Sequence, residues 1–313
     1  MSILVYTETE NGKFRKNALE VVSYARSIAN QSGEMVTAIA LNAENAEELF
    51  KFGADKVIKA NGNAHKISPE ILGKFIADKA DGKAVVLAHS AEGASIAPFI
   101  AYNLDAALIT NVLETPSSVS PFKVKRKSFS GKGIMEAASA TEKTVLSVSP
   151  NSFGIKENAV NGAIEEISLD IADGKVKVEK VETNEGVLDL KEASIVVSAG
   201  RGMKGPENWG MIEDLAQVLG AATACSKPVS DMDWRPHSEH VGQTGKAIAP
   251  NLYIAVGISG AIQHLAGVNA SKNIVVINND PEAPFFKSAD YGIVGDAFEI
   301  VPKLTEAIKK YKN

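Results

Sequence analysis

The chain has 313 residues, of which 45% are hydrophobic and 23% are charged, and its formal net charge is -5. This composition is that of an ordinary globular protein with enough apolar residues for buried cores, and the negative charge argues against a general nucleic-acid binder. The single cysteine, Cys225, excludes a disulfide framework within the chain and fits a reducing compartment. Because domains usually hold about 100–200 residues, we expect two.

Strand-like and helix-like patterns alternate through the first 110 residues. The sequence predicts strands at residues 2–7, 35–41, 56–59 and 84–88, and helices at residues 17–30, 46–52 and 69–80. Strands that alternate with helices favour parallel pairing, because each crossover helix returns the chain to the same end of the sheet. The first part of the chain is therefore expected to be a layered α/β domain.

The pattern changes near residue 111. Residues 111–190 are rich in Val, Ser, Thr and Lys, and residues 144–148 alternate with a period of two. This pattern predicts added strands that complete the first domain, with antiparallel pairing as one option. The basic residues at 123–127 are typical of the solvent-facing side of a strand. The charged segment 173–189 predicts a linker, which gives domains at residues 1–188 and 189–313.

The second half alternates again. Strands are expected at residues 194–199, 252–258, 273–278 and 291–294, and helices at residues 209–219, 261–266 and 297–311. Each of these strands is followed by a polar loop. Because ligands of open parallel sheets bind beyond the carboxyl ends of the strands, we expect these loops to converge on one binding site.

Several motifs bear on the chemistry of that site. Residues 200–205 match G-x-G-x-x-G, but residues 219–225 lack the acidic residue that a dinucleotide-binding fold needs about 20 positions later. Ser259 and Gly260 join a strand to a helix, where the serine either caps the helix or faces a ligand. His264 follows about one turn later, and its role is either structural or to contact that ligand.

Protein side chains alone offer little catalytic chemistry. His237 and His240, three positions apart with Glu239 between them, suggest a metal site. Pro236 and Gly242 bracket this segment, however, so no helix is expected to bring the side chains to one face; with no third ligand evident, no metal is expected. The sequence contains no P-loop, no C-x-x-C pair and no G-x-S-x-G turn. A bound cofactor that performs the chemistry is the better interpretation.

The loops carry a family resemblance. Residues 241–246 (Val-Gly-Gln-Thr-Gly-Lys) and 257–264 (Gly-Ile-Ser-Gly-Ala-Ile-Gln-His) closely resemble the alpha subunits of electron transfer flavoproteins, and residues 198–202, 278–284 and 289–296 extend the match. The resemblance implies a heterodimer with a beta subunit and one FAD in a Rossmann-like C-terminal domain. It also implies an N-terminal domain that resembles a nucleotide-binding domain without holding a nucleotide.

The resemblance assigns FAD contacts to individual positions. They are Arg201, Ser226, Lys227, Val241, Gly242, Gln243, Thr244, Ser259, Gly260, Ala261, Ile262, Gln263, His264, Asn278 and Asp296. Thr244 would offer its hydroxyl near flavin N5, His264 would stabilise negative charge at N1 and O2, and Asp296 would accept hydrogen bonds from ribose. Family members commonly have Arg where this chain has Lys227, which keeps the charge but lacks the planar fork. His240 is either a titratable group near the flavin or an exposed loop residue.

The implied function is that of an electron carrier rather than a stand-alone enzyme. Family members take electrons from flavin dehydrogenases, often the acyl-CoA dehydrogenases of fatty acid beta-oxidation, and a quinone oxidoreductase is a common acceptor. The alternatives are an electron-bifurcating subunit that uses NADH, an NAD-linked dehydrogenase, and a nucleotide-sensing scaffold subunit. Residues 1–10 do not resemble a secretory signal and no apolar run reaches about 18 residues, so we expect a cytoplasmic protein without membrane insertion.

Overall fold

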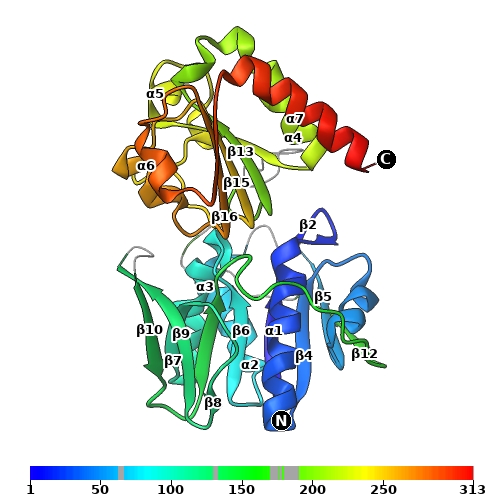
Figure 1. The fold of residues 1–313 in the computed structure, drawn as a ribbon. Helices are drawn as coiled ribbons and strands as arrows, with labels where there is room; N and C mark the ends of the chain where they lie inside the picture. The colour runs from blue at the N-terminus through cyan, green and yellow to red at the C-terminus, as the bar shows by residue number, and fades with distance from the viewer. Residues whose placement is uncertain (63–66, 130–132, 170–175, 177, 180–189, 313) are drawn as a thin grey trace. The chain divides into compact units, whose positions relative to one another are not determined.

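The structure is a computed structural model that describes residues 1–62, 67–129, 133–169, 176, 178–179 and 190–312. It divides into two compact units, Met1–Thr183 and Asn184–Asn313. The expected boundary between residues 188 and 189 lies outside the described residues, as does most of the linker expected at 173–189. Each unit contains its own sheet with helices packed on it (Figure 1).

The sheet of the N-terminal unit is mostly parallel. Its strand order is β10-β9-β7-β11-β6-β1-β4-β5-β12, and β8 pairs with β9. The strands are β1 (Ser2–Thr7), β4 (Met35–Leu41), β5 (Lys56–Asn61), β6 (Ala84–Ala88), β7 (Ala107–Val112), β8 (Ser118–Val119), β9 (Phe122–Ser128), β10 (Gly133–Ala138), β11 (Thr144–Val148) and β12 (Ala163–Ser168). Antiparallel pairing is confined to β7, β8, β9 and β10. The antiparallel option for residues 144–148 is wrong, because β11 pairs in parallel with both β6 and β7.

Helices cover both faces of this sheet. Helix α1 (Lys16–Ser32) and the 3-10 helix η1 (Ala46–Phe52) pack on one face, and α2 (Pro69–Asp78) and α3 (Ala91–Leu104) pack on the other. Successive side chains of β1 point to opposite faces. Consequently Ile3 joins the core under α1, whereas Leu4 joins the core under α2 and α3. A short hairpin of β2 (Thr9–Glu10) and β3 (Lys13–Phe14) completes the unit.

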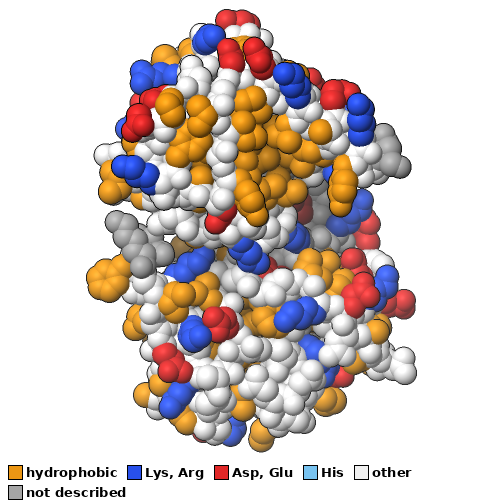
Figure 2. Space-filling model, viewed as in Figure 1, with side chains coloured by type: hydrophobic (Ala, Val, Ile, Leu, Met, Phe, Trp, Pro, Cys, Tyr) orange, Lys and Arg blue, Asp and Glu red, His pale blue; other side chains and the backbone are white. Residues whose placement is uncertain are grey.

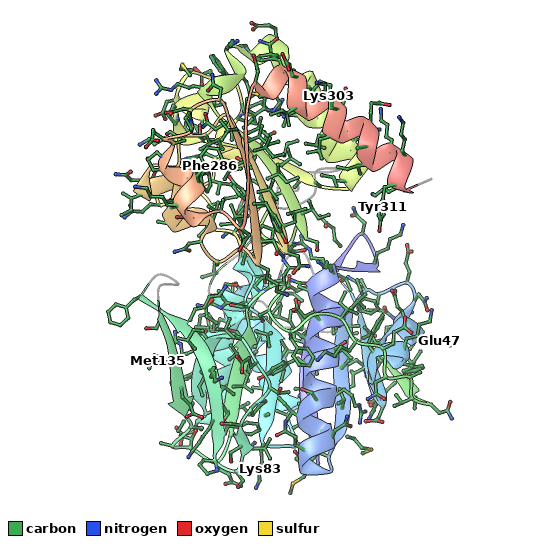
Figure 3. The ribbon with its side chains drawn as sticks, in the orientation of Figure 1. Glu47, Lys83, Met135, Phe286, Lys303 and Tyr311 are labelled. Carbon is green, nitrogen blue, oxygen red and sulfur yellow. The ribbon has the colours of Figure 1, made fainter. Side chains whose placement is uncertain are left out.

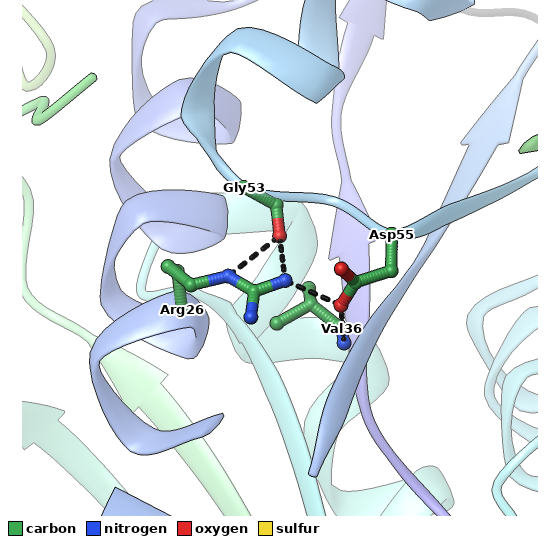
Figure 4. A network of polar contacts seen from close by, with 4 residues as sticks. All are labelled: Arg26, Val36, Gly53 and Asp55. Carbon is green, nitrogen blue, oxygen red and sulfur yellow. Dashed lines mark hydrogen bonds and ion pairs between the residues drawn. The ribbon is translucent and has the colours of Figure 1, made fainter. Parts of the chain in front are cut away.

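One polar network fixes α1 against this sheet (Figure 4). Arg26 on α1 donates from Nε to the carbonyl oxygen of Gly53 at 2.9 Å and forms an ion pair with Asp55. The Asp55 carboxylate also accepts from the backbone N–H of Val36 at 2.7 Å. The Arg26 and Asp55 side chains are only 12% and 26% exposed, so the pair is well shielded from solvent. The network therefore joins α1 to the beginnings of β4 and β5.

The C-terminal unit is a five-stranded, wholly parallel sheet in the order β14-β13-β15-β16-β17. The strands are β13 (Ile195–Ala199), β14 (Ala222–Cys225), β15 (Leu252–Val256), β16 (Asn273–Asn278) and β17 (Tyr291–Val294). Helices α4 (Gly210–Leu219) and α7 (Ala297–Lys312) pack on one face, and α6 (Ile262–Val268) lies on the other. The chain leaves β13 toward β14 on one side and then returns to β15 on the other. The carboxyl ends of β13 and β15 therefore flank the point where the strand order reverses, which is where such sheets bind ligands.

The outer strand β17 is exposed along its length. Tyr291 and Val294 are 67% and 58% exposed, and hydrophobic side chains gather on one face of this unit (Figure 2). Among the labelled side chains, Tyr311 lies near the end of α7 and Met135 lies within β10 (Figure 3). None of the helices in the described part of the chain is long and apolar enough to span a bilayer.

Candidate functional site

A cavity of about 580 Å³ lies beyond the carboxyl ends of the strands of the C-terminal unit, a size typical of small-molecule and cofactor sites. Its lining residues are Arg201, Gly202, Ser226, Lys227, Pro228, Asp231, His240, Val241, Gly242, Gln243, Thr244, Gly257, Ile258, Ser259, Ala261, Gln263, His264, Asn278, Asp280 and Ala283. These residues come from the segments that follow β13, β14, β15 and β16, which confirms the expected convergence of those loops. The loop after β17 contributes no lining residue.

The crevice between β13 and β15 is built by glycines. A Cβ atom on Gly202 would lie 2.6 Å from the Cα of Gly257, so the two backbones touch where no side chain fits. Gly257 has φ +59°, a conformation that favours glycine, and its carbonyl oxygen accepts from the Gly202 N–H at 3.1 Å. The G-x-G-x-x-G match at residues 200–205 therefore serves a backbone contact, and the chain continues in 3-10 turns at Arg201–Met203 and Pro206–Asn208.

The segment after β14 brings charge to the cavity. Ser226 is buried and precedes the short helix α5 (Lys227–Asp231), but its hydroxyl does not cap that helix. Lys227 is exposed and lines the cavity, and Asp231 at the end of the same helix lines it too. The wall of the cavity therefore contains a serine hydroxyl together with one positive and one negative side chain.

An arginine clamps the next part of this segment. Arg235 donates two hydrogen bonds to the carboxylate of Glu239, from Nε at 2.8 Å and from Nη2 at 2.6 Å. Its Nη1 donates to Glu213 on α4 at 2.9 Å, and its guanidinium lies 5.6 Å from the ring centroid of Trp209. Because a planar guanidinium can form two parallel hydrogen bonds to a carboxylate, this contact fixes the orientation of both side chains in addition to pairing their charges. The residues leading into the Val241 loop are thus tied to α4.

The loop at residues 241–246 is held on both sides. The Val241 N–H donates to Cys225 at 3.0 Å, and the Gln243 N–H donates to the carbonyl oxygen of Gln263 at 2.7 Å. Gly242 packs against Gly267: a Cβ added to Gly267 would lie 2.5 Å from the Cα of Gly242. Gln243 and Thr244 remain exposed while lining the cavity, so their polar groups are free to meet a ligand.

His264, on α6, is the most constrained polar side chain of the site. Its Nε2 lies 2.8 Å from the hydroxyl of Tyr253, and its ring packs edge-on against Phe285 at 5.7 Å between centroids. Burial and, to a smaller extent, nearby His240 together lower the pKa of His264 to about 4, while the backbone of Val241 acts in the opposite direction. The imidazole is therefore neutral near pH 7.

The second nitrogen of His264, Nδ1, is buried and has no described acceptor at hydrogen-bond distance. The backbone of Val241 nevertheless lies close enough to raise the pKa of the ring. Burial raises the pKa of the Tyr253 phenol, so this hydroxyl keeps its proton and can donate it to Nε2. The hydrogen of the neutral imidazole then resides on Nδ1. An unsatisfied donor on a cavity-lining residue is costly unless a ligand acceptor meets it.

Three predicted contact positions do not line the cavity. Gly260 has φ +82° and packs on Phe285, and Ile262 is 69% exposed. Asp296 accepts from the backbone N–H of Phe298 at 2.9 Å, at the beginning of α7. Ser259 is not the helix cap, because α6 begins at Ile262 with Ala261 before it.

Asn278 lies at the end of β16 and joins two loops. Its Nδ2 donates to the carbonyl oxygen of Ile258 at 3.0 Å, and its Oδ1 accepts from the Asp280 N–H at 3.0 Å. The side chain therefore positions the β15 loop as well as lining the cavity.

Some lining residues had no predicted role. They are Gly202, Pro228, Asp231, Gly257, Ile258, Asp280 and Ala283. Gly202, Pro228 and Ile258 directly adjoin predicted positions, which is the one signal that could have found them; the other four do not. His240, for which an exposed position was an alternative, is only 6% exposed. Within the described ranges, no three His, Cys, Asp or Glu side chains are grouped so that they could hold a metal ion.

Comparison with known proteins finds similarity along most of the chain. A family model described as "Electron transfer flavoprotein domain" matches residues 3–172, and one described as "Electron transfer flavoprotein FAD-binding domain" matches residues 189–269. The chain is 37% identical over 319 residues to the electron transfer flavoprotein subunit alpha of Bacillus subtilis, covering 98% of this chain and 97% of the relative. It is 38% identical to the subunit alpha of Pseudomonas aeruginosa, covering 98% of this chain and all of the relative. It is 35% identical to the Escherichia coli protein FixB, covering 93% of this chain and 94% of that protein.

Proposed function

The chain belongs to the electron transfer flavoprotein alpha-subunit family, and from that premise we propose that it carries electrons on an FAD bound in the cavity of its C-terminal unit. The donors are flavin dehydrogenases, with acyl-CoA dehydrogenases of fatty acid beta-oxidation as the leading class. The acceptor is a quinone oxidoreductase or a protein of similar role. The FAD supplies reversible uptake and release of electrons, and the protein binds it and sets its potential.

The observation that carries the cofactor assignment is the unpartnered Nδ1 of His264. The Tyr253 hydroxyl at 2.8 Å holds the imidazole in one orientation, and burial keeps it neutral. A fixed, neutral N–H donor suits a carbonyl oxygen that gains negative charge on reduction, such as O2 of a flavin.

The remaining lining residues fit the other parts of an FAD. Thr244 and Gln243 offer exposed polar groups for the ring edge. Arg201 and Lys227 bring positive charge that suits the pyrophosphate or an electron-rich ring. Ser226 offers a hydroxyl that its own helix does not use. Asn278 supplies an amide, and Asp296, which lies outside the cavity lining, would serve the ribose of the adenosine end.

The complete carrier is a heterodimer with a beta subunit. The family implies this partner, and we assign its contact to the N-terminal domain, residues 1–188, with FAD in residues 189–313. A cytoplasmic location fits the single buried cysteine, because a thiol with a pKa raised to about 12 by burial stays unreactive and serves as packing.

The test is to purify the chain with its beta partner and to record the visible spectrum and the flavin content. One FAD per heterodimer, reducible by an acyl-CoA dehydrogenase with its substrate, is the expected result. A second reducible FAD and reduction by NADH would instead identify the bifurcating alternative. A colourless complex that turns over nicotinamide would contradict the proposal and favour the NAD-linked dehydrogenase, whereas bound FAD that no dehydrogenase reduces would favour the scaffold subunit.

A further inference from the structure

We propose that His240 is a second titratable group of the cofactor cavity and takes up a proton from solvent when negative charge enters that cavity. This inference rests on the proposed function, because the charge is the electron delivered to the bound FAD. It adds a proton-coupled residue to those that the family resemblance assigns. Three features carry it: the location of the ring, the charges around it, and the contrast with His264.

The ring of His240 lies between the cavity and the glycine loop. His240 is 6% exposed and lines the cavity. A Cβ on Gly245 would lie 2.7 Å from its Nδ1, and a Cβ on Gly242 would lie 3.4 Å from its Nε2. A Cβ on Gly242 would also lie 3.7 Å from the Cα of His264. The two imidazole-bearing residues therefore meet at Gly242, and both glycines leave room for the His240 ring.

The backbone of His240 is fixed on both sides. Residue 240 forms a parallel β-bridge with Cys225 at the end of β14, and its carbonyl oxygen accepts from the Lys246 N–H at 2.9 Å. On its N-terminal side Glu239 is clamped by Arg235 through two hydrogen bonds. The side chain is thus held in the wall of the cavity.

The surroundings of His240 keep it neutral in the absence of added charge. Burial lowers its pKa first, and the charges of Lys227 and His237 lower it further, while the Asp231 carboxylate raises it. The other facing groups are His264, which is neutral near pH 7, and the Cys225 thiol, whose pKa burial raises to about 12. The nearest negative charge is therefore that of Asp231, and another one would favour the imidazolium.

His264 responds less than His240. Its Nε2 is bonded to the Tyr253 hydroxyl and its pKa lies at about 4. A large stabilisation of its charged form would therefore be needed for His264 to take up a proton near pH 7. For the His240 ring, no hydrogen bond comparable to the Tyr253–His264 bond is seen among the described residues, and its pKa is lowered mainly by burial. Of the two histidines, His240 is thus the one whose protonation near pH 7 responds to a moderate change of charge in the cavity.

The step balances in charge and atoms. When the bound cofactor gains one electron from the reduced flavin of the donor dehydrogenase, one proton would move from water to the imidazole of His240. When the acceptor takes the electron, the proton returns to water. No bond other than N–H is made or broken, and the local charge of the cavity is unchanged over the cycle.

The direct test is NMR of the purified heterodimer with its FAD bound and its histidine rings isotopically labelled. The His240 ring is titrated in the oxidised complex and in the fully reduced complex under anaerobic conditions. We expect the titration midpoint of His240 to rise on reduction. An unchanged His240 midpoint in a complex that binds and reduces FAD would overturn the inference and leave the proposed function intact, whereas a complex without FAD would overturn the function itself.

Variants give a second readout that does not depend on activity. The one-electron midpoint potential of the bound FAD is measured against pH in the wild-type complex and in the His240→Gln and His237→Gln complexes. A tenfold change in proton activity shifts a one-electron potential by up to about 59 mV when one proton is taken up with the electron. Between the pH midpoints of His240 in the oxidised and the reduced complex, the potential of the wild type should therefore depend more steeply on pH than that of H240Q. H237Q is the control for loss of a neighbouring histidine: His237 bonds to Ser230 at 2.8 Å and does not line the cavity, so this variant keeps the His240 ring and should keep a steeper slope than H240Q. Equal slopes in wild type and H240Q would contradict the inference.

Discussion

The hydroxyl of Tyr253 lies 2.8 Å from Nε2 of His264, and both side chains are almost wholly buried. Tyr253 comes from β15 and His264 from α6, so the contact joins the sheet to the helix that packs on it. With the Tyr253 hydroxyl as the donor, the imidazole hydrogen lies on Nδ1. A structural hydrogen bond in the core therefore orients an imidazole that lines the cavity.

Replacing Tyr253 with Phe should destabilise the protein by about 1–3 kcal/mol, because Nε2 of His264 loses its buried partner. The imidazole hydrogen should also no longer be confined to Nδ1. Chemical denaturation of the purified complex measures the first effect, and ring nitrogen shifts measure the second. The matched control is Tyr291→Phe, whose hydroxyl belongs to an exposed side chain and whose loss should change stability by less than about 0.5 kcal/mol. Equal effects in the two variants would argue against the Tyr253–His264 bond.

The low pKa of His264 makes stability depend on pH. Its pKa is about 4 in the folded protein against 6.5 for an ordinary histidine, so the unfolded chain binds more protons between these two values. The free energy of unfolding should therefore fall as pH is lowered from 6.5 to 4, by about 3 kcal/mol in total. Denaturation curves across this range test the slope, and the His264→Gln variant should show a shallower one. A slope that is the same in both proteins would show that His264 does not carry the effect.

The glycine contact between β13 and β15 should tolerate no side chain. Gly202→Ala places a methyl group 2.6 Å from the Cα of Gly257, and overpacking of this kind costs about 1–3 kcal/mol. Because the displaced backbone lines the cavity, the FAD content should fall as well. Gly210→Ala is the control, since a Cβ there meets nothing within 4 Å at the beginning of α4, and it should stabilise by up to about 1 kcal/mol. The measurements are thermal unfolding and flavin absorbance, and full FAD content in G202A would contradict the crevice as the cofactor site.

The contacts of Arg235 with Glu239 should stabilise the folded protein more than an ordinary surface ion pair does. Arg235→Ala removes two hydrogen bonds to Glu239, whose side chain is 12% exposed, and should lower the free energy of unfolding by about 1.5–3 kcal/mol. Arg235→Lys should restore only part of this loss, because an ammonium group cannot form the planar fork. Lys309→Ala, which breaks the exposed pair with Glu306, should change stability by less than about 0.5 kcal/mol. Similar losses in R235A and K309A would show that the clamp is only a surface ion pair.

The alternation of strands and helices was enough to predict the α/β class and most of the elements. The prediction for residues 144–148 failed in orientation, because a short Val- and Leu-rich strand looks the same whether its neighbours run parallel or antiparallel. Its burial between β6 and β7 depends on pairings with residues about 40 to 60 positions away. Helix α3 was not predicted, since its small residues and Pro98 weaken the helical pattern.

The site could be predicted to the extent that it lies in contiguous loops. The 241–244 loop and the residues at 259, 261, 263 and 264 all line the cavity, as the positions quoted from the sequence would require. The role of Tyr253 could not be read from the sequence, because it depends on a strand side chain meeting a helix side chain across the core. Nor could the burial of His240, which follows from its bridge to Cys225.

The most direct measurement of the central claim is an experimental structure of the purified heterodimer with its FAD. The account predicts that the isoalloxazine ring occupies the cavity lined by Thr244 and His264, with Nδ1 of His264 donating a hydrogen bond to the ring. A flavin bound elsewhere in the complex, or one whose ring leaves that nitrogen unpartnered, would contradict it.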